Sequence, residues 1–400
     1  MAIEGIEPSP LQLDRVREDF EKFQLIFQFL ESRGLEKSLA ILQAETGIEF
    51  EISSTPQGGI LDTLIDDYIG MRATGLPQKS ASDDLPEPGF CATEIQTAIP
   101  NIHGTANPTC LTWSTEGEDI IVTGGVDKRL LFHRDDGEYI SELTLPSPVL
   151  CVDWSRDTII VGCMGGEVAL VSVIDVSSPE LVSISKPHGH ARVTHVEFGD
   201  SFYVSVAKDV KVWEVLSNKE CRTIRCERDV SSVCWINDDV LVVAEVDNPI
   251  LKLHDVKQGL VLGELCMNKN LYDPRTAYTT LKMAFHETCR LLIASTTRNS
   301  VLLFKLPVFE ENAENPIVPI RTLYGMSIGI YDVPSLCFSL DGTHIYTSSD
   351  KEIIVFETKS GHKIFNIPIS DSKPVRGFTR QKSTDRLATV SFDRFMKIVA

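Results

Sequence analysis

The sequence predicts an all-β seven-bladed β-propeller preceded by a small N-terminal all-α module. Three observations support this prediction. A short motif built around an aromatic residue recurs seven times, each copy is followed by β-branched runs and polar turns, and residues 11–50 show helical periodicity instead. With 400 residues, of which 42% are hydrophobic and 24% charged, the chain can bury a core of this size.

The first element, residues 11–73, is expected to be helical. Its apolar residues follow helical spacing, and Gly34 can end a first short helix in a left-handed conformation and start a second. The run ILDTLIDDYIGM, residues 60–71, predicts a third helix. The spaced apolar residues of the first two helices are Phe23, Ile26, Phe27, Leu30, Leu35, Leu39 and Leu42.

Part of this element, LIFQFLESRGLEKSLAILQAE, resembles the LisH motif, although Leu35 stands where that family usually has tyrosine. The resemblance implies a parallel homodimer in which two copies share one four-helix core. An amphipathic hairpin packed against its own propeller is the alternative. The matching residues are Leu25, Ile26, Phe27, Phe29, Leu30, Gly34, Leu35, Ser38, Leu39, Leu42 and Glu45. The expected dimerisation residues are Leu25, Ile26, Phe29, Leu30, Leu39 and Leu42.

Residues 74–90, TGLPQKSASDDLPEPGF, are rich in Pro, Ser and Asp. This composition is typical of a flexible linker between domains. The linker should therefore tether the helical module to the propeller.

The propeller is expected over residues 91–400, and its blades are marked by the recurring motif. The motif aromatics are Trp113, Trp154, Phe198, Trp235, Phe285, Phe338 and Phe378, separated by 41, 44, 37, 50, 53 and 40 residues. These spacings centre on the 40 to 45 residues of a four-stranded blade. Runs such as IIVTGG and VLVVAE follow as second strands, and RLLFH, VKVWEV and EIIVFET as third strands.

The seventh blade lacks a fourth strand, because the last residue, Ala400, directly follows a third strand. An unpaired sheet edge invites aggregation, so another segment should cover it. Residues 91–99, CATEIQTAI, have suitable length and alternation to close this blade. Truncation within this segment should destabilise the ring.

Residues 93–400 resemble the WD-repeat family, with degenerate signatures. Trp213-Glu214 and His254-Asp255 stand at the family's Trp-Asp position, and Phe132, Phe304 and Phe356 occupy equivalent places. One blade comes close to the family's hydrogen-bonded set, with Gly189-His190 before its first strand, Ser205 in its second and Trp213 in its third.

Charge and cysteine content narrow the class of protein. The net charge of −19 and the absence of a Lys/Arg stripe argue against a nucleic-acid binder. No segment approaches the length of a membrane span, so no membrane partner is expected. Ten cysteines without any C-x-x-C pair suggest reduced thiols in an intracellular protein, either cytoplasmic or nuclear.

No catalytic, cofactor or metal motif is evident, so no enzymatic activity and no cofactor are expected. His188 and His190 could form a metal pair, but a structural turn is the better interpretation. The run Asp135-Asp136-Gly137-Glu138 resembles part of a calcium loop yet lacks the remaining ligands, which favours a solvated hairpin.

The expected function is protein–protein interaction on one propeller face by a dimeric scaffold. By resemblance, such proteins include ubiquitin-ligase substrate receptors, corepressors or chromatin adaptors, and microtubule or dynein regulators. A different class, a phosphopeptide or lipid-headgroup sensor, is the alternative. Such a sensor needs a basic pocket at the rim, and Arg192 would be its first residue. The expected partner-binding residues, six before a motif aromatic, are Asn107, Arg192, Asp229, Thr279, Asp332 and Ser372.

Overall fold

The computed structural model describes residues 26, 27, 29, 30, 35–46, 85, 86, 89, 91–115, 119–267, 279–306, 318–329 and 333–400. The chain divides into two compact units, Met1–Pro77 and Gln78–Ala400. Each unit is described by itself.

The first unit contains helix α2 (Glu36–Thr46), and its described residues before Leu35 are also helical. The Leu35 N–H donates to the Leu30 carbonyl (2.8 Å), which joins this helical segment to α2. Phe27 is buried, whereas Leu35 and Ile41 are 45% and 60% exposed. Five expected dimerisation residues are half-buried in the single chain: Ile26, Phe29, Leu30, Leu39 and Leu42. Leu25, Gly34 and the third helix expected over 60–71 lie outside the described residues, so the LisH-type module stays a prediction.

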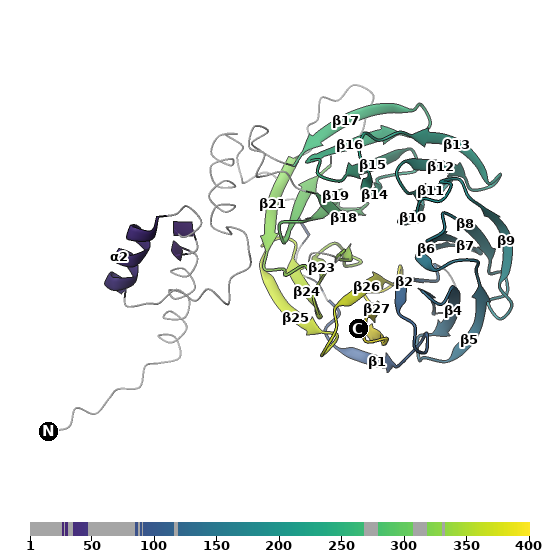
Figure 1. Cartoon of the computed structure of the whole chain (residues 1–400), viewed down its shortest axis with the longest axis horizontal. Helices are drawn as coiled ribbons and strands as arrows, with labels where there is room; N and C mark the ends of the chain where they lie inside the picture. The colour runs from purple at the N-terminus through teal and green to yellow at the C-terminus, as the bar shows by residue number, and fades with distance from the viewer. Residues whose placement is uncertain are drawn as a thin grey trace. The chain divides into compact units, whose positions relative to one another are not determined.

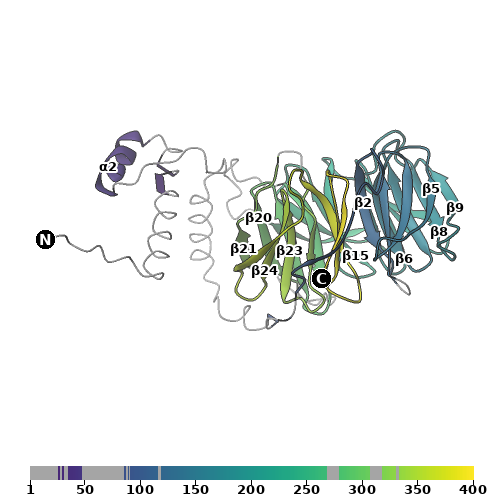
Figure 2. The same cartoon turned by 90° about the horizontal axis from the view of Figure 1, so that it is seen from below.

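The second unit is a ring of seven four-stranded antiparallel sheets, as the recurring aromatic motif predicted (Figure 1). In every sheet the first strand lies nearest the axis and the fourth lies at the rim (Figure 1), and Figure 2 shows the ring from its edge. Blades 1 to 3 comprise β2 (Pro108–Trp113), β3 (Ile120–Gly125), β4 (Arg129–Arg134), β5 (Tyr139–Thr144); β6 (Val149–Ser155), β7 (Thr158–Cys163), β8 (Val168–Ser172), β9 (Glu180–Ser185); and β10 (His195–Phe198), β11 (Phe202–Val206), β12 (Val210–Glu214), β13 (Lys219–Ile224).

Blades 4 to 7 repeat this plan, except that the fourth strand of blade 7 comes from the start of the propeller. They comprise β14 (Val230–Trp235), β15 (Val240–Glu245), β16 (Ile250–Asp255), β17 (Leu260–Cys266); β18 (Thr280–His286), β19 (Leu291–Thr296), β20 (Ser300–Lys305), β21 (Val318–Tyr324); β22 (Leu336–Phe338), β23 (His344–Ser349), β24 (Glu352–Glu357), β25 (Lys363–Pro368); and β26 (Val375–Arg380), β27 (Leu387–Ser391), β28 (Met396–Val399), β1 (Ile95–Ile99).

The second strands are buried along almost their whole length because each is covered on both faces by a neighbouring blade. In β7, Ile159 and Val161 pack in a cluster with Phe132 of blade 1. Ile160, which points to the other face, packs with Tyr203 of blade 3. Similar apolar clusters occupy all seven junctions between blades, and all seven motif aromatics lie on first strands. Continuous β-branched runs therefore mark strands covered on two sides.

The ring is closed by β1, which pairs antiparallel with β28 from Ile95↔Val399 to Ile99↔Met396. This is the position at which the sequence leaves an unpaired edge. The same junction is joined by Arg386, which bridges Asp119 and Asp135 of blade 1 at 3.2 and 2.7 Å. Ring closure therefore combines a strand ladder with a charged contact.

One residue of the expected linker belongs to the propeller. Leu85 is only 5% exposed and packs in the cluster between blades 5 and 6, with Leu291 and Phe338 among its neighbours. The composition of residues 74–90 predicted a flexible linker. Burial of the single side chain of Leu85 in an apolar cluster is nevertheless enough to attach this part of the chain to the propeller. The packed part of this unit therefore begins before residue 91. Among the described residues, no helix has the length and apolarity needed to cross a membrane.

Candidate functional site

The two faces of the ring carry different connections. One face holds the segments that cross from a fourth strand to the next first strand, together with the turns between second and third strands; we call it the crossing-loop face. The opposite face holds the remaining connections, those between first and second strands and between third and fourth strands. Every candidate site lies on one of these faces or near the axis.

The connections of the two faces differ in charge. On the crossing-loop face the described connections carry nine acidic and ten basic side chains, whereas on the opposite face they carry twelve acidic and six basic ones. The twelve are Asp119, Asp135, Asp136, Glu138, Asp157, Asp175, Asp200, Asp238, Asp239, Glu287, Asp341 and Asp385, and the six are Arg156, Lys257, Arg290, Lys359, Lys382 and Arg386. The opposite face should therefore attract cationic partners.

The expected partner-binding residues precede first strands and so lie on the crossing-loop face. Asn107, Arg192, Asp229 and Ser372 are exposed there. Thr279 is not available, because it is 8% exposed and its hydroxyl donates to Asp247 Oδ1 (3.0 Å) and accepts the Asp247 N–H (2.9 Å). Asp332 lies outside the described residues. A position six residues before the motif aromatic thus lies on this face, but the spacing does not determine whether its side chain is exposed.

Apolar side chains on the same face were missed by the sequence analysis. Val126, Met164 and Val246 each directly follow a second strand and are 45%, 56% and 36% exposed. Their N–H groups donate to the carbonyls of Asn107, Pro148 and Asp229, which fixes each one beside the start of a first strand. The sequence feature that could have revealed them is an apolar residue in the turn directly after a second strand. This face therefore carries both charged and apolar groups.

Two histidine networks fix the crossing segments of blades 1 and 3. In blade 3 His188, and not the predicted His190, contacts Ser205 Oγ (Nε2–Oγ 2.9 Å), which also accepts from Trp213 Nε1 (3.0 Å). In blade 1 His103 contacts Asp127 (3.0 Å) and Thr123 Oγ1 (3.1 Å).

Burial lowers the pKa of His103 and of His188, although Asp127 opposes this effect at His103. Both rings are therefore neutral at pH 7 and act as structural hydrogen-bonding groups. No group of three or more potential metal ligands exists among the residues described.

Near the axis, three polar side chains of the inner strands bind one another. Lys282 Nζ lies 3.2 Å from His195 Nδ1, and His195 Nε2 lies 3.2 Å from Glu197 Oε2. Burial and the nearby lysine lower the pKa of His195. A neutral ring accepts from the ammonium and donates to the carboxylate, so this trio links blades 3 and 5 across the inner strands.

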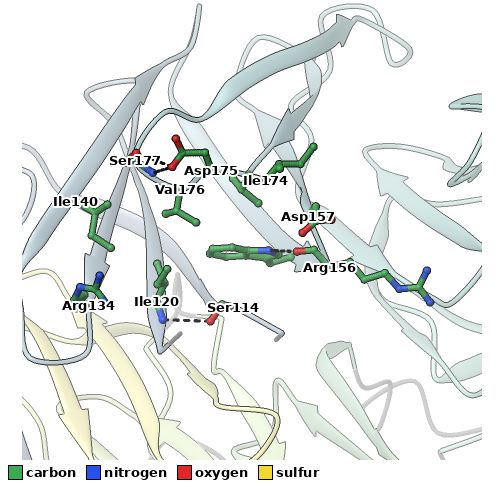
Figure 3. A pocket seen from close by; sticks show the side chains of 12 residues that line it. Ser114, Ile120, Arg134, Ile140, Arg156, Asp157, Ile174, Asp175, Val176 and Ser177 are labelled. Atoms are coloured by element: carbon green, nitrogen blue, oxygen red, sulfur yellow. Dashed lines mark hydrogen bonds between the residues drawn. The ribbon is translucent and has the colours of Figure 1, made fainter. Parts of the chain in front are cut away.

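A pocket of about 500 Å³ opens on the opposite face between blades 1 and 2 (Figure 3). Its apolar wall includes Ile120, Ile140 and Trp154, and its rim includes Asp157 and Asp175. The remaining lining residues are Ser114, Arg134, Arg156, Val173, Ile174, Val176 and Ser177. We call this cavity the junction pocket.

Two basic residues, Arg134 and Arg156, also line the junction pocket. Arg134 pairs with Glu138 through Nε at 3.1 Å. The side chain of Arg156 extends away from Ile140 and Val176 (Figure 3). The pocket therefore combines an apolar wall with a polar rim, and it lies on an acidic face.

Comparison with known families gives a match to a single repeat. The model of the WD domain, G-beta repeat, matches residues 318–357, which run from β21 through the first three strands of blade 6. The match ends at Phe356 and Glu357, the position at which the sequence analysis placed a degenerate Trp-Asp dipeptide. No curated protein matches the chain. The protein is thus a seven-bladed β-propeller that is similar to WD-repeat proteins over this repeat.

Proposed function

We propose that the protein is a non-catalytic scaffold that binds partner proteins on the crossing-loop face and pairs two copies through its N-terminal helices. The observation that carries the proposal is the group of exposed apolar side chains at equivalent positions of blades 1, 2 and 4, Val126, Met164 and Val246. Exposed Arg192 and Asp229 lie on the same face. Apolar anchors with charged neighbours are the chemistry of protein interfaces.

Pairing through the helices is supported by their incomplete burial. Ile26, Phe29, Leu30, Leu39 and Leu42 are only half-buried in the single chain. A second copy could cover them, and two rings in one particle would increase avidity for a partner with two epitopes.

A ubiquitin-ligase substrate receptor is the first specific form of this proposal, and a corepressor or microtubule regulator is the second. No disulfide bond joins the ten cysteines, all of which lie among the described residues, and this supports residence in the cytoplasm or nucleus. Cell fractionation would test this location.

The function is tested by quantitative affinity capture from the native cell with three proteins. These are the wild type, a Phe29→Asp, Leu30→Asp variant and a Met164→Asp, Val246→Asp variant. The helix variant should lose self-association in analytical ultracentrifugation, and the face variant should lose its stoichiometric partners while still self-associating. Captured ligase subunits would support the receptor form. Retention of all partners by the face variant would refute binding on the crossing-loop face.

A further inference from the structure

We propose that the junction pocket binds a bulky apolar side chain of a partner protein segment that carries Lys or Arg beside this anchor. The pocket lies on the face opposite the crossing-loop face. It would therefore be a second docking surface, separate from the one proposed above.

The size and lining of the junction pocket suit an anchor side chain. A volume of about 500 Å³ lies within the range of ligand-binding cavities. Ile120, Ile140, Trp154 and Val176 contribute apolar surface to it. Interfaces derive much of their affinity from one large side chain inserted into such a recess.

The walls of the pocket are fixed before any partner binds. Trp154 Nε1 donates to the Arg156 carbonyl (2.6 Å), and the indole meets the ring of Phe132 edge-on at 6.2 Å. Asp175 Oδ1 accepts both the N–H (2.9 Å) and the hydroxyl (2.6 Å) of Ser177 (Figure 3). A preformed recess avoids the entropic cost of ordering side chains during association.

Ile174 is the exposed feature that a partner would cover. Its side chain is 82% exposed, although its backbone neighbours are firmly held. The Val173 N–H donates to the Asp157 carbonyl (2.8 Å), and Ser141 Oγ donates to the Val176 carbonyl (2.5 Å). Apolar exposure therefore continues from the pocket along the following strand, where Leu181 and Val182 are 42% and 64% exposed.

The charge of the surrounding face favours a cationic partner, and of the two arginines that line the pocket Arg134 is paired with Glu138. The connections of this face carry twice as many acidic as basic side chains among the described residues. At the pocket rim, the hydrogen bonds from Ser177 lower the pKa of Asp175, so this carboxylate is ionised at pH 7. Asp157 is exposed beside it. Lys or Arg next to the apolar anchor would meet both carboxylates.

The test is selection of a phage-displayed random peptide library on the full-length protein, followed by synthesis of the enriched peptides. We expect the peptides to share a large apolar residue flanked by Lys or Arg. Their affinity should fall at least tenfold in Ile174→Asp and severalfold in Asp157→Lys. The matched control is Leu216→Asp, because Leu216 is 96% exposed in the corresponding connection of blade 3. This control should change affinity less than twofold.

The proposal is overturned if no peptide is enriched, if the enriched peptides are acidic, or if Ile174→Asp leaves their affinity unchanged. It is also overturned if Ile174→Asp abolishes self-association in ultracentrifugation, since a second copy would then be the occupant. The Met164→Asp, Val246→Asp variant should bind these peptides normally. A failure of the crossing-loop face as a docking surface would thus be distinguished from a failure of the junction pocket.

Discussion

Removal of strand β1 should open the ring, and two truncated chains isolate its effect. One chain starts at Cys91 and keeps β1, whereas the other starts at Pro100 and lacks it. Both lack the N-terminal unit and Leu85, so only the closing segment distinguishes them.

The expected loss in free energy of unfolding can be estimated from the contacts of residues 91–99. Four positions of β1 are aligned with β28, and Thr93 and Glu94 exchange three further backbone bonds with Ala400 at 2.9 to 3.1 Å. At about 1 kcal/mol net for each backbone bond, and with about one ladder bond for each aligned position, their loss amounts to roughly 7 kcal/mol. The Ala92 N–H also donates to the buried hydroxyl of Tyr346 (3.0 Å), which would lose this partner. Domains are stable by only about 5 to 15 kcal/mol, so the open ring should be barely folded.

Urea denaturation followed by tryptophan fluorescence measures the difference between the two chains. The chain starting at Pro100 should unfold at a much lower urea concentration and should self-associate through the uncovered edge of β28. Addition of a synthetic peptide with the sequence of residues 91–100 should restore its stability. Equal midpoints for both chains would refute the closing role of β1.

Three further predictions concern single residues. Burial raises the pKa of Asp153 to about 6, above its ordinary value, so its contribution to stability is greatest in acid and is lost as the pH rises through 6. Asp153 remains partly exposed, which limits the effect. When the pH is lowered from 7 to 5, the free energy of unfolding of the wild type should rise by only about 1 kcal/mol relative to that of Asp153→Asn. A difference between the two proteins in urea denaturation that does not change with pH would contradict this. Gly166→Ala should lower the free energy of unfolding by about 3 kcal/mol in the same assay. Gly166 has a φ of +88°, and an added Cβ would lie 2.2 Å from the Gly189 carbonyl oxygen. A loss below about 0.5 kcal/mol, as for an ordinary surface substitution, would exclude this clash. Tyr203→Phe should cost about 1 kcal/mol through loss of the hydrogen bond to Asn218 Oδ1 (2.5 Å), as measured by thermal unfolding, and an unchanged melting temperature would argue against this bond.

The ring could be predicted from sequence because its determinants are local and repeated. A strand covered on both faces favours apolar and β-branched residues, and runs rich in such residues follow the seven aromatics at blade spacing. Closure by β1 could be anticipated for the same reason, since an unpaired edge must be covered. The packing of Leu85 could not, because the cluster that it joins between blades 5 and 6 is formed by residues 206 to 271 positions further along the chain, from Leu291 to Phe356.

The crossing-loop face was predicted in position but not in detail. The offset of six residues from the motif aromatic placed Asn107 and Arg192 correctly at the surface, because first strands begin at equivalent heights. It failed for Thr279, whose hydroxyl is held by the Asp247 turn. The His188 network was misassigned to His190 because a dipeptide motif does not show which of two nearby imidazoles reaches Ser205.

The junction pocket lay beyond sequence reasoning because no single repeat contains it. Its lining extends from Ser114 to Ser177 and draws on the second, third and fourth strands of blade 1, on the connection after its first strand, and on blade 2. The recess forms where two adjacent sheets meet. The strands of each blade run from one face of the ring to the other and connect the two faces rigidly. Partners bound at Met164 and at Ile174 would therefore be held at opposite ends of the same blade. One such ring could therefore join two proteins without dimerisation, and pairing through the helices would then double the number of bound partners rather than create the bridge.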